Sequence, residues 1–451
     1  MLVNVTVENW MSFRDSTTLS MGATKERQHG ERIPRVAKYR ARVLPIAVLY
    51  GGNASGKTNF FKALRFVQRF VVDGTYPDQK IPVQPFLLDN SSEKPSRFSV
   101  TILVDETMYE LSFAATRQSV LEEKLVGVLS SAERVLYHRT SPKGEGIVFD
   151  PSLGDQDFLR FAARGTRDNQ LFLTNAVSQN ISTFSPVYSW FKDSLHFISP
   201  DARFGPFVRF FERESPLASA AQTLLARLDT GVVRLDGEEV PVDELPISES
   251  QLSELRSRLR EDEVATLFAG RNRRIVILRD GDSLTAKKMV AYHRTVDGSE
   301  CKFDMAQESD GTVRIIDLLP AFVDLSEHGS TDVYVIDELD RNLHTFVTKF
   351  FIEMYMASCS SSSRSQLLFT THDLLLMDQK LFRRDEMWIT ERDQTGVSTL
   401  LSFAEYENVR YDKDIRKSYL LGRLGGVPRV PQCPYVLEIG EAHEEAQGNE
   451  S

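Results

Sequence analysis

The chain has 451 residues, of which 41% are hydrophobic and 26% are charged, and its formal net charge is −10. This composition is ordinary for a globular protein in water, and no apolar run approaches the roughly 20 residues of a membrane span. Three distant cysteines argue against a disulfide framework or a zinc site and fit reduced thiols in the cytoplasm. The negative charge leaves at most a local basic patch for nucleic acid.

The N-terminal half predicts strands around a strand–loop–helix unit. Residues 2–8 and 17–21 alternate as strands do, and no basic segment of a signal peptide precedes them. Residues 43–50 form an apolar strand, and residues 59–72 follow a helical pattern. Farther on, the pattern predicts three antiparallel strands and then a helix, at residues 98–104, 107–113, 127–139 and 158–180 respectively.

A glycine-rich loop joins the apolar strand to the first helix. Gly51 and Gly56 allow the backbone to curl so that several N–H groups point inward, and the positive end of the helix faces the same cavity. Lys57 is expected to reach the β- and γ-phosphates of a nucleotide, and the hydroxyl of Thr58 to hold Mg²⁺. The alternative is a chance match in a glycine turn, which the flanking strand and helix make rarer. The predicted nucleotide-binding residues are Gly51, Asn53, Ala54, Ser55, Gly56, Lys57, Thr58 and Asn59.

Residues 200–300 predict an inserted, mainly helical lobe. Segments 215–228 and 249–263 follow helical patterns, and the first opens with a cap residue and a proline, Ser215-Pro216. Residues 231–240 between them predict a short hairpin. On this division, residues 1–199 and 301–440 are the two halves of one large α/β domain, and residues 441–451 form a disordered acidic tail.

Two apolar strands in the C-terminal half end in candidate catalytic side chains. Residues 333–336 lead to Asp337 and Glu338, and residues 366–371 lead to His372. Hydrolysis of a γ-phosphate requires Mg²⁺ opposite the P-loop and a group that orients water. Asp337 suits the metal, Glu338 suits the water, and His372 suits a hydrogen bond to the γ-phosphate. The alternatives are a common acidic turn and an ordinary satisfied histidine.

The segment Glu308-Ser-Asp-Gly-Thr312 is expected to open a helix that runs to residue 322. Ser309 and Gly311 at such a helix start offer a hydroxyl, backbone N–H groups and a positive dipole end to an anion. A simple N-cap is the alternative. Beyond it, residues 343–357 predict a helix, and residues 386–390 and 396–403 predict a hairpin at a sheet edge.

Together these motifs resemble the ABC-type ATPase superfamily, in its soluble branch of SMC-like and OLD-like ATPases. The matches are Walker A (Gly51–Thr58), a signature (Glu308–Thr312), Walker B (Val333–Glu338), a D-loop (Leu339-Asp340) and a switch histidine (His372). Residues 7–14 are similar to the Asn-Phe-x-Ser-Phe start of these proteins, and residues 384–388 and 419–428 are similar to a bacterial subgroup of stand-alone, AAA-named ATPase heads. The signature reads Glu-Ser-Asp-Gly-Thr in place of Leu-Ser-Gly-Gly-Gln, a departure seen in that subgroup.

The resemblance implies ATP and Mg²⁺ as cofactors and two heads that sandwich the nucleotide. Ser309 and Gly311 of one copy then face the P-loop of another, and Asp340 joins the ATP site. Gln84 is the candidate Q-loop ligand of Mg²⁺. The chain is therefore expected to form a homodimer or a higher homo-oligomer.

The sequence lacks both the long coiled coils of SMC-like heads and the Toprim nuclease domain of OLD proteins, so any nuclease is expected on another polypeptide. Stand-alone heads of this kind resemble the ATPase subunits of bacterial anti-phage systems, above all the AriA type of the PARIS system. That resemblance implies a cytoplasmic sensor that holds a Toprim nuclease effector and releases it on meeting a phage-encoded trigger protein. The alternatives are an SMC-like DNA repair or maintenance ATPase and a scaffold that binds nucleotide without hydrolysing it. Nucleic acid stays open as a partner, and a membrane is not expected.

Overall fold

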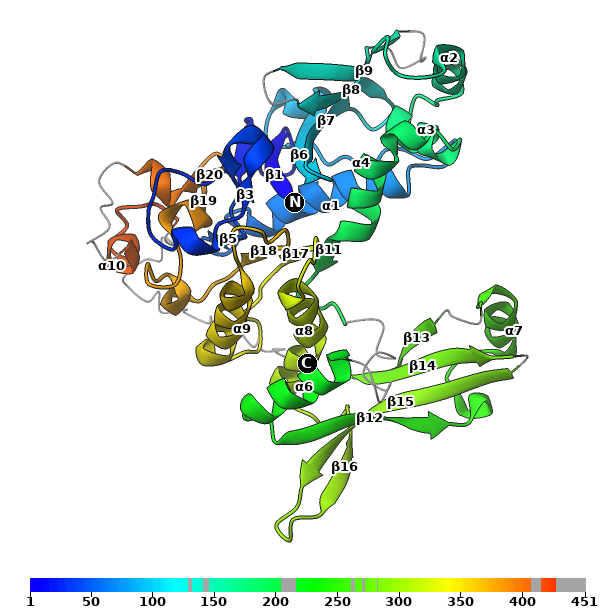
Figure 1. The fold of residues 1–451 in the computed structure, drawn as a ribbon, viewed down its shortest axis with the longest axis vertical. Helices are drawn as coiled ribbons and strands as arrows, with labels where there is room; N and C mark the ends of the chain where they lie inside the picture. The colour runs from blue at the N-terminus through cyan, green and yellow to red at the C-terminus, as the bar shows by residue number, and fades with distance from the viewer. Residues whose placement is uncertain are drawn as a thin grey trace, which may run out of the picture.

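A six-stranded sheet carries the P-loop and forms the centre of the molecule (Figure 1). This computed structural model describes residues 1–128, 132–140, 146–203, 216–260, 264–269, 272–281, 283–406 and 415–426. In sheet order, the strands are β11 (Leu195–Ile198), β17 (Val333–Ile336), β18 (Gln366–Thr370), β5 (Ile46–Tyr50), β19 (Met387–Arg392) and β20 (Ser398–Ser402). Neighbouring strands are parallel except in the β19–β20 hairpin, which lies at the sheet edge as predicted. The predicted α/β class is confirmed.

The register of the parallel strands brings three strand ends to one edge of the sheet. Ile336 of β17 pairs with Phe369 of β18, and Thr370 of β18 pairs with Leu49 of β5. The carboxyl ends of neighbouring parallel strands are where open α/β sheets bind ligands. The residues that follow these three strands, including Asp337, His372 and Gly51, therefore gather at a single edge.

Alternate residues of β5 face two different hydrophobic cores. Ala47 and Leu49 belong to the core that includes α1 (Lys57–Val72). Ile46, Val48 and Tyr50 belong to the core that includes α8 (Asp310–Ser326) and α9 (Thr345–Ser358). Because side chains alternate along a strand, the P-loop helix and the helix of the predicted signature cover opposite faces of the sheet.

A seven-stranded antiparallel sheet packs on the other side of α1. In sheet order, its strands are β10 (Ile147–Phe149), β9 (Glu133–Arg139), β8 (Val120–Val128), β7 (Thr107–Ala115), β6 (Ser96–Val104), β1 (Leu2–Glu8) and β2 (Thr17–Ser20). Phe66 of α1 stacks on Trp10 with ring centroids 5.1 Å apart and lies 5.0 Å from Phe98 of β6. Smaller elements complete this region: β3 (Arg35–Val36), β4 (Ala41–Arg42), α2 (Gln156–Arg164), α3 (Phe172–Ser178) and α4 (Ser185–Ser189). Near the C-terminus, α10 (Ile415–Leu420) belongs to the core that includes α8 and α9.

Two sequence predictions in this sheet region are wrong in detail. The segment 127–139 is not one strand, because it holds the end of β8 and all of β9, and β8 was missed. The charged residues of β8 hide the alternation of apolar and polar positions that marks a strand. Glu123 of β8, for example, is fully buried and pairs with Arg139 of β9 at 3.6 Å. The segment 158–180 is two helices rather than one. Asn169 lies between them and donates hydrogen bonds to the carbonyls of residues 76, 77 and 79, which holds that linker in place.

The inserted lobe is built mainly of strands, so the prediction of a mainly helical lobe is wrong. Its sheet has the order β12 (Val232–Val240), β15 (Ser283–Arg294), β14 (Arg273–Asp280) and β13 (Val264–Ala269), and β16 (Glu300–Asp304) also pairs with β15. Within the described part of the lobe, α6 (Pro216–Arg227) and α7 (Glu249–Arg258) are the two α-helices. The segment 231–240 is the single strand β12 rather than a hairpin, because its partner β15 lies some fifty residues later in the chain.

The lobe is joined to the main domain through α8. Helix α6 packs on both α8 and β12 (Figure 1). Arg274 of β14 forms a buried ion pair with Asp317 of α8 at 2.7 Å. Across the described ranges, no helix is long and apolar enough to cross a membrane. Ser215 and the predicted acidic tail, residues 441–451, lie outside the described residues.

Candidate functional site

The P-loop runs from the end of β5 to the start of α1, and its conformation depends on two glycines. Gly51 has φ +148° and Gly56 has φ +120°. A Cβ atom on Gly56 would lie 2.7 Å from the Ser398 hydroxyl oxygen, and one on Gly51 would lie 2.6 Å from the Ser55 hydroxyl oxygen. Both the backbone angle and the lack of space therefore require glycine. Asn53 and Ala54 lie exposed at the tip of the loop.

Lys57 folds over the loop from the first turn of α1. Its buried ammonium donates hydrogen bonds to the carbonyl oxygens of Gly51, at 2.7 Å, and Gly52, at 3.1 Å. Burial lowers the pKa of Lys57 to about 8, while the carboxylates of Asp337, Glu338 and Asp340 act in the opposite direction. The structure thus brings the Walker A lysine and the acidic residues after β17 into one electrostatic cluster.

Asp337 and Glu338 are held by Thr370, a residue that the sequence analysis did not single out. The Thr370 hydroxyl donates to the Asp337 carboxylate at 2.6 Å and accepts from the Glu338 backbone N–H at 2.7 Å. Glu338 has φ +50°, a left-handed conformation that costs a non-glycine residue about 1–3 kcal/mol. Such strained residues cluster at functional sites. The Glu338 carbonyl also accepts from Arg314 of α8 at 3.3 Å.

His372 follows β18 and lies beside the D-loop. Its backbone N–H donates to the Asp340 carboxylate at 3.2 Å. Partial burial, followed by the charge of Lys57, lowers the pKa of His372, so the neutral imidazole is favoured. The second carboxylate oxygen of Asp340 is buried and has no hydrogen-bond partner within the described part of the chain. A buried orphan acceptor of this kind beside a lysine and a histidine is consistent with a ligand-binding site.

The predicted signature begins α8, on the opposite face of the sheet from α1. Ser309 is the N-cap of α8, and its hydroxyl accepts from the Thr312 N–H at 3.1 Å. A Cβ atom on Gly311 would lie 2.9 Å from the carbonyl oxygen of Asn342, just beyond the D-loop. Within one chain, the signature therefore packs against the segment after Walker B rather than against its own P-loop.

Two other predicted residues, Asn59 of α1 and Gln84, each contact the turn at residues 9–14. Asn59 donates to the Ser12 hydroxyl at 2.9 Å, and its carbonyl accepts from the Trp10 indole at 2.9 Å. The Gln84 carbonyl accepts from the Met11 N–H at 2.6 Å, and its exposed side chain lines a groove along α1. The role of Gln84 as a metal ligand stays a prediction.

Three supporting residues of the P-loop come from the far C-terminal part of the chain. Ser55 shares a 2.6 Å hydrogen bond with Thr390 of β19, and the Ser398 hydroxyl of β20 donates to the Ser55 carbonyl at 2.7 Å. The carbonyl of Gly426 accepts from the Gly52 N–H at 3.1 Å. The similarity of residues 419–428 to other ATPase heads was the only sequence signal for the last contact; residues 427–428 lie outside the described ranges.

The residues at this edge fit a nucleotide with its metal. No group of three or more His, Cys, Asp or Glu side chains that could hold a metal ion by themselves occurs in the described residues. Mg²⁺ in nucleotide sites takes only one or two protein ligands, because phosphate oxygens and water supply the others. Thr58 and Asp337 meet that requirement, and the glycine curl with the buried Lys57 offers a cradle for phosphate.

Comparisons with known proteins place the chain in a family. No curated protein sequence matched. Among solved structures, the SMC head domain from Thermotoga maritima has 11% identity and a TM-score of 0.37, with 89% of this chain and 98% of that chain covered. A structure of SmcHead bound to the C-winged helix domain of ScpA has 12% identity and a TM-score of 0.39, with 89% and 97% covered. Residues 46–378 match the AAA_21 family, described as "AAA domain, putative AbiEii toxin, Type IV TA system". Because the match spans more than half of the 451 residues, the chain belongs to the AAA_21 family of AAA domains.

Proposed function

We propose that the chain binds and hydrolyses ATP at the edge formed by the P-loop and the ends of β17 and β18. The observation that carries this proposal is the cluster in which the buried Lys57 is influenced by Asp337, Glu338 and Asp340. A buried lysine that contacts only loop carbonyls and faces three carboxylates suits the polyphosphate of a nucleotide together with a divalent cation.

Each residue then has a role that follows from its position. Lys57 binds the β- and γ-phosphates, and the P-loop N–H groups orient them. Thr58 and Asp337 hold Mg²⁺, which when bound neutralises phosphate charge. Glu338 orients the attacking water and accepts its proton, and the neutral imidazole of His372 donates to the γ-phosphate. The Thr370 hydroxyl keeps Asp337 and the Glu338 backbone in register with each other.

Two substitutions separate binding from turnover. Lys57→Ala should abolish binding of a fluorescent ATP analogue, because it removes the charge that faces the phosphates. Glu338→Gln should bind the analogue normally and release no phosphate, because the amide retains the shape but cannot accept a proton. Lys349→Gln, on the exposed side of α9, is the matched control. Wild-type phosphate release by Glu338→Gln would remove Glu338 from the proposed role.

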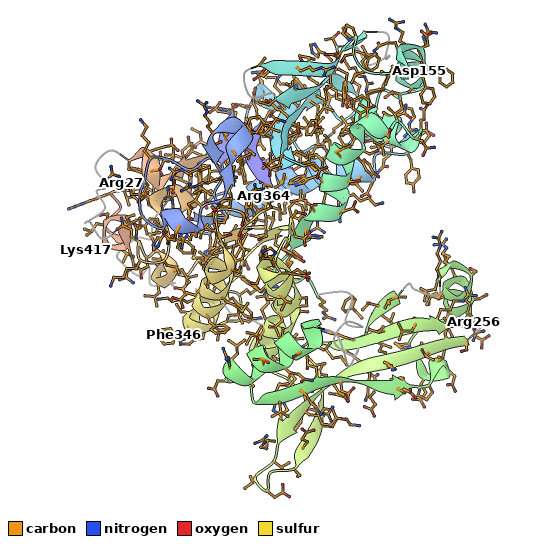
Figure 2. The ribbon with its side chains drawn as sticks, in the orientation of Figure 1. Arg27, Asp155, Arg256, Phe346, Arg364 and Lys417 are labelled. Carbon is orange, nitrogen blue, oxygen red and sulfur yellow. The ribbon has the colours of Figure 1, made fainter. Side chains whose placement is uncertain are left out.

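Self-association is the second part of the proposal. Ser309 and Gly311 lie on the face opposite the chain's own P-loop, so they can meet the nucleotide only of another copy. Exposed apolar side chains beside the D-loop and the switch histidine support such a contact. Phe346 is 76% exposed at the start of α9 (Figure 2), and Leu375 is 60% exposed. The two segments are tied together, because Thr345 donates to Asp373 at 2.5 Å.

A complementation experiment tests the shared site. Lys57→Ala and Ser309→Arg should each be inactive alone, but a mixture should regain ATP hydrolysis, since one composite site per dimer keeps an intact P-loop and an intact signature. A specific activity that is independent of protein concentration, in a chain that stays monomeric with ATP, would show that each site is complete in one copy.

The biological setting is the third part of the proposal. We infer a cytoplasmic sensor of the AriA type that holds a separate Toprim nuclease effector and releases it on contact with a phage-encoded trigger protein. The family description names a putative AbiEii toxin of a type IV toxin–antitoxin system, which supports a toxin–antitoxin setting, whereas the separate effector rests on the resemblance to AriA-type heads. Expression with the neighbouring gene should yield a stable complex, and Lys57→Ala or Glu338→Gln should block effector-dependent growth arrest. Purification of the chain alone from its operon, with phage sensitivity unchanged in these variants, would favour DNA repair or maintenance.

A further inference from the structure

A groove of about 530 Å³ runs along the exposed side of α1, away from the edge that carries the nucleotide cluster. Three basic residues of α1 line it: Lys62, Arg65 and Arg69. Their spacing of three and four residues puts them on one face of the helix. At a rise of 1.5 Å per residue, the stripe is about 10 Å long. We call this feature the α1 groove.

The positive charges of the α1 groove are not neutralised by the chain itself. Across the described ranges, none of the three basic side chains forms an ion pair, and Asp73 is the single carboxylate in the lining. Burial and the neighbouring charge of Arg69 lower the pKa of Arg65. In a chain with a net charge of −10, three unpaired cations in one groove mark a place where an anion would be stabilised.

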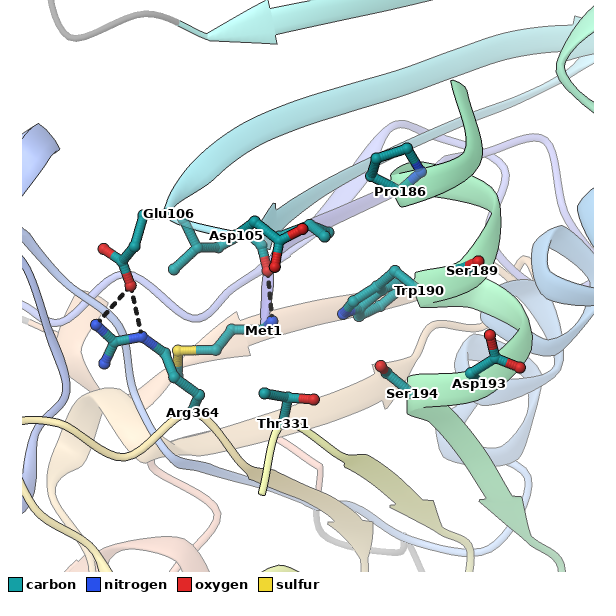
Figure 3. A pocket seen from close by; sticks show the side chains of 12 residues that line it. Met1, Asp105, Glu106, Pro186, Ser189, Trp190, Asp193, Ser194, Thr331 and Arg364 are labelled. Atoms are coloured by element: carbon teal, nitrogen blue, oxygen red, sulfur yellow. Dashed lines mark hydrogen bonds and ion pairs between the residues drawn. The ribbon is translucent and has the colours of Figure 1, made fainter. Parts of the chain in front are cut away.

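The pocket in Figure 3 provides a contrast. It has a volume of about 380 Å³ and also contains an arginine, Arg364. There the guanidinium donates two hydrogen bonds to Glu106, at 2.8 and 3.0 Å (Figure 3), so its charge is already matched. Among the residues that the structure describes, the cations of the α1 groove have no such counterion, and this distinguishes a candidate anion site from a structural arginine.

The floor and rim of the α1 groove are aromatic. Trp10, Phe66 and Phe70 form the floor, with Trp10 and Phe66 stacked at 5.1 Å and Phe66 and Phe70 at 5.5 Å. At the rim, the ring of Tyr76 is 80% exposed and free to accept another ring. Basic residues interleaved with aromatic rings are how proteins bind single-stranded nucleic acid, because phosphates meet the cations and unpaired bases stack on the rings.

We propose that the α1 groove binds a single strand of nucleic acid, with its phosphates on Lys62, Arg65 and Arg69 and a base stacked on Tyr76. A duplex would use the three cations but not the ring, because its bases are already stacked inside. An acidic protein segment would likewise use the charges alone. The aromatic rim beside the basic stripe is therefore the feature that selects the single strand.

The test measures fluorescence anisotropy of a labelled oligothymidylate of about 15 nucleotides with the full chain and no ATP, from about 50 to about 300 mM NaCl. Wild type should bind with a logarithmic salt slope of about −2, since each phosphate contact on a single strand contributes about −0.7. The triple variant Lys62→Gln, Arg65→Gln, Arg69→Gln should lose that slope. Tyr76→Ala should weaken binding at least fivefold, and Tyr76→Phe should retain it. Lys349→Gln, with an unchanged melting temperature, is the control.

Three results would overturn the proposal. The first is no binding by wild type at the lowest salt concentration. The second is an unchanged salt slope in the triple variant. The third is tighter binding of a duplex of the same length or of a polyglutamate peptide, with no effect of Tyr76→Ala. Because the assay contains no ATP, none of these results depends on whether the chain hydrolyses ATP.

Discussion

Replacing Asp317 by alanine should be among the most damaging single changes in the protein. Asp317 lies on α8 and pairs at 2.7 Å with Arg274 of the lobe, and the two side chains are 6% and 0% exposed. Without the carboxylate, the buried guanidinium of Arg274 would lose this ion-pair partner. Burial already lowers the pKa of Arg274, while Asp317 raises it. Breaking one side of such a pair costs about 3–5 kcal/mol.

Urea unfolding followed by circular dichroism measures the free energy of this change. The matched control is Glu353→Ala, which breaks the Lys349–Glu353 pair at 3.7 Å with side chains 39% and 56% exposed. That surface pair should contribute no more than about 1 kcal/mol. The double replacement Arg274→Met with Asp317→Leu should recover part of the lost stability, because it removes the Arg274 charge, while the buried Arg314 still loses the nearby carboxylate. A cost for Asp317→Ala no greater than that of Glu353→Ala would refute the reasoning.

Three further predictions concern the nucleotide site. ATP affinity should be constant below pH 8 and should fall by up to tenfold per pH unit above it. The reason is that Lys57 has a pKa of about 8 in the protein without ATP, and bound phosphate would raise that pKa. Titration calorimetry in two buffers would detect the accompanying proton uptake. Thr370→Val should lower turnover about tenfold, because it removes both hydrogen bonds that hold Asp337 and Glu338, whereas Thr370→Ser should restore it in a phosphate-release assay. Gly426→Val should weaken ATP binding, since φ is +69° and a Cβ would lie 2.6 Å from Ile389; Gly154→Ala, which has open space, should leave the binding isotherm unchanged.

The edge of the sheet that carries the proposed nucleotide site could be predicted because the sequence signals for it are local. A P-loop is a continuous run of residues. Asp337 and His372 each come directly after an apolar strand, and the carboxyl ends of neighbouring parallel strands lie at the same edge of a sheet. The structure has β17 at residues 333–336, as predicted, and the parallel register brings the three ends together. The sequence signal for an N-cap at Ser309 was also local, and the Ser309 side chain does cap α8.

The supports of the site could not be predicted, because they depend on pairing between distant parts of the chain. Thr390 and Ser398 touch the P-loop only because β19 lies beside β5 in the sheet and β20 lies beside β19. Nothing in the short polar residues themselves distinguishes them from others in a hairpin. Thr370 is a further case, since a threonine inside an apolar strand suits packing equally well.

The secondary structure of the lobe was predicted wrongly for a related reason. Its strands carry many charges because one face of the sheet is solvated. For example, Lys288 of β15 bridges Glu238 of β12 and Asp304 of β16 at 3.1 and 2.9 Å. Cross-strand ion pairs of this kind stabilise a sheet only once its strands are paired. Read along the sequence, these charges break the alternation that marks a strand, so the strands from β13 to β16 were not predicted, whereas the helical patterns at residues 215–228 and 249–263 do correspond to α6 and α7.

The position of the lobe bears on how a partner could influence the proposed ATPase. Two contacts join the lobe to the region of α8, and a third joins α8 to Glu338. His293 of β15 lies 2.6 Å from Glu308 at the start of the signature, and Arg274 pairs with Asp317 farther along α8. Arg314, between them on α8, donates to the carbonyl of Glu338, the residue held in a left-handed conformation. The buried Arg274–Asp317 ion pair and the His293–Glu308 contact thus join the lobe to the signature helix and the segment before it. We therefore expect any partner that binds the lobe to affect first the signature helix and, through Arg314, the backbone of Glu338.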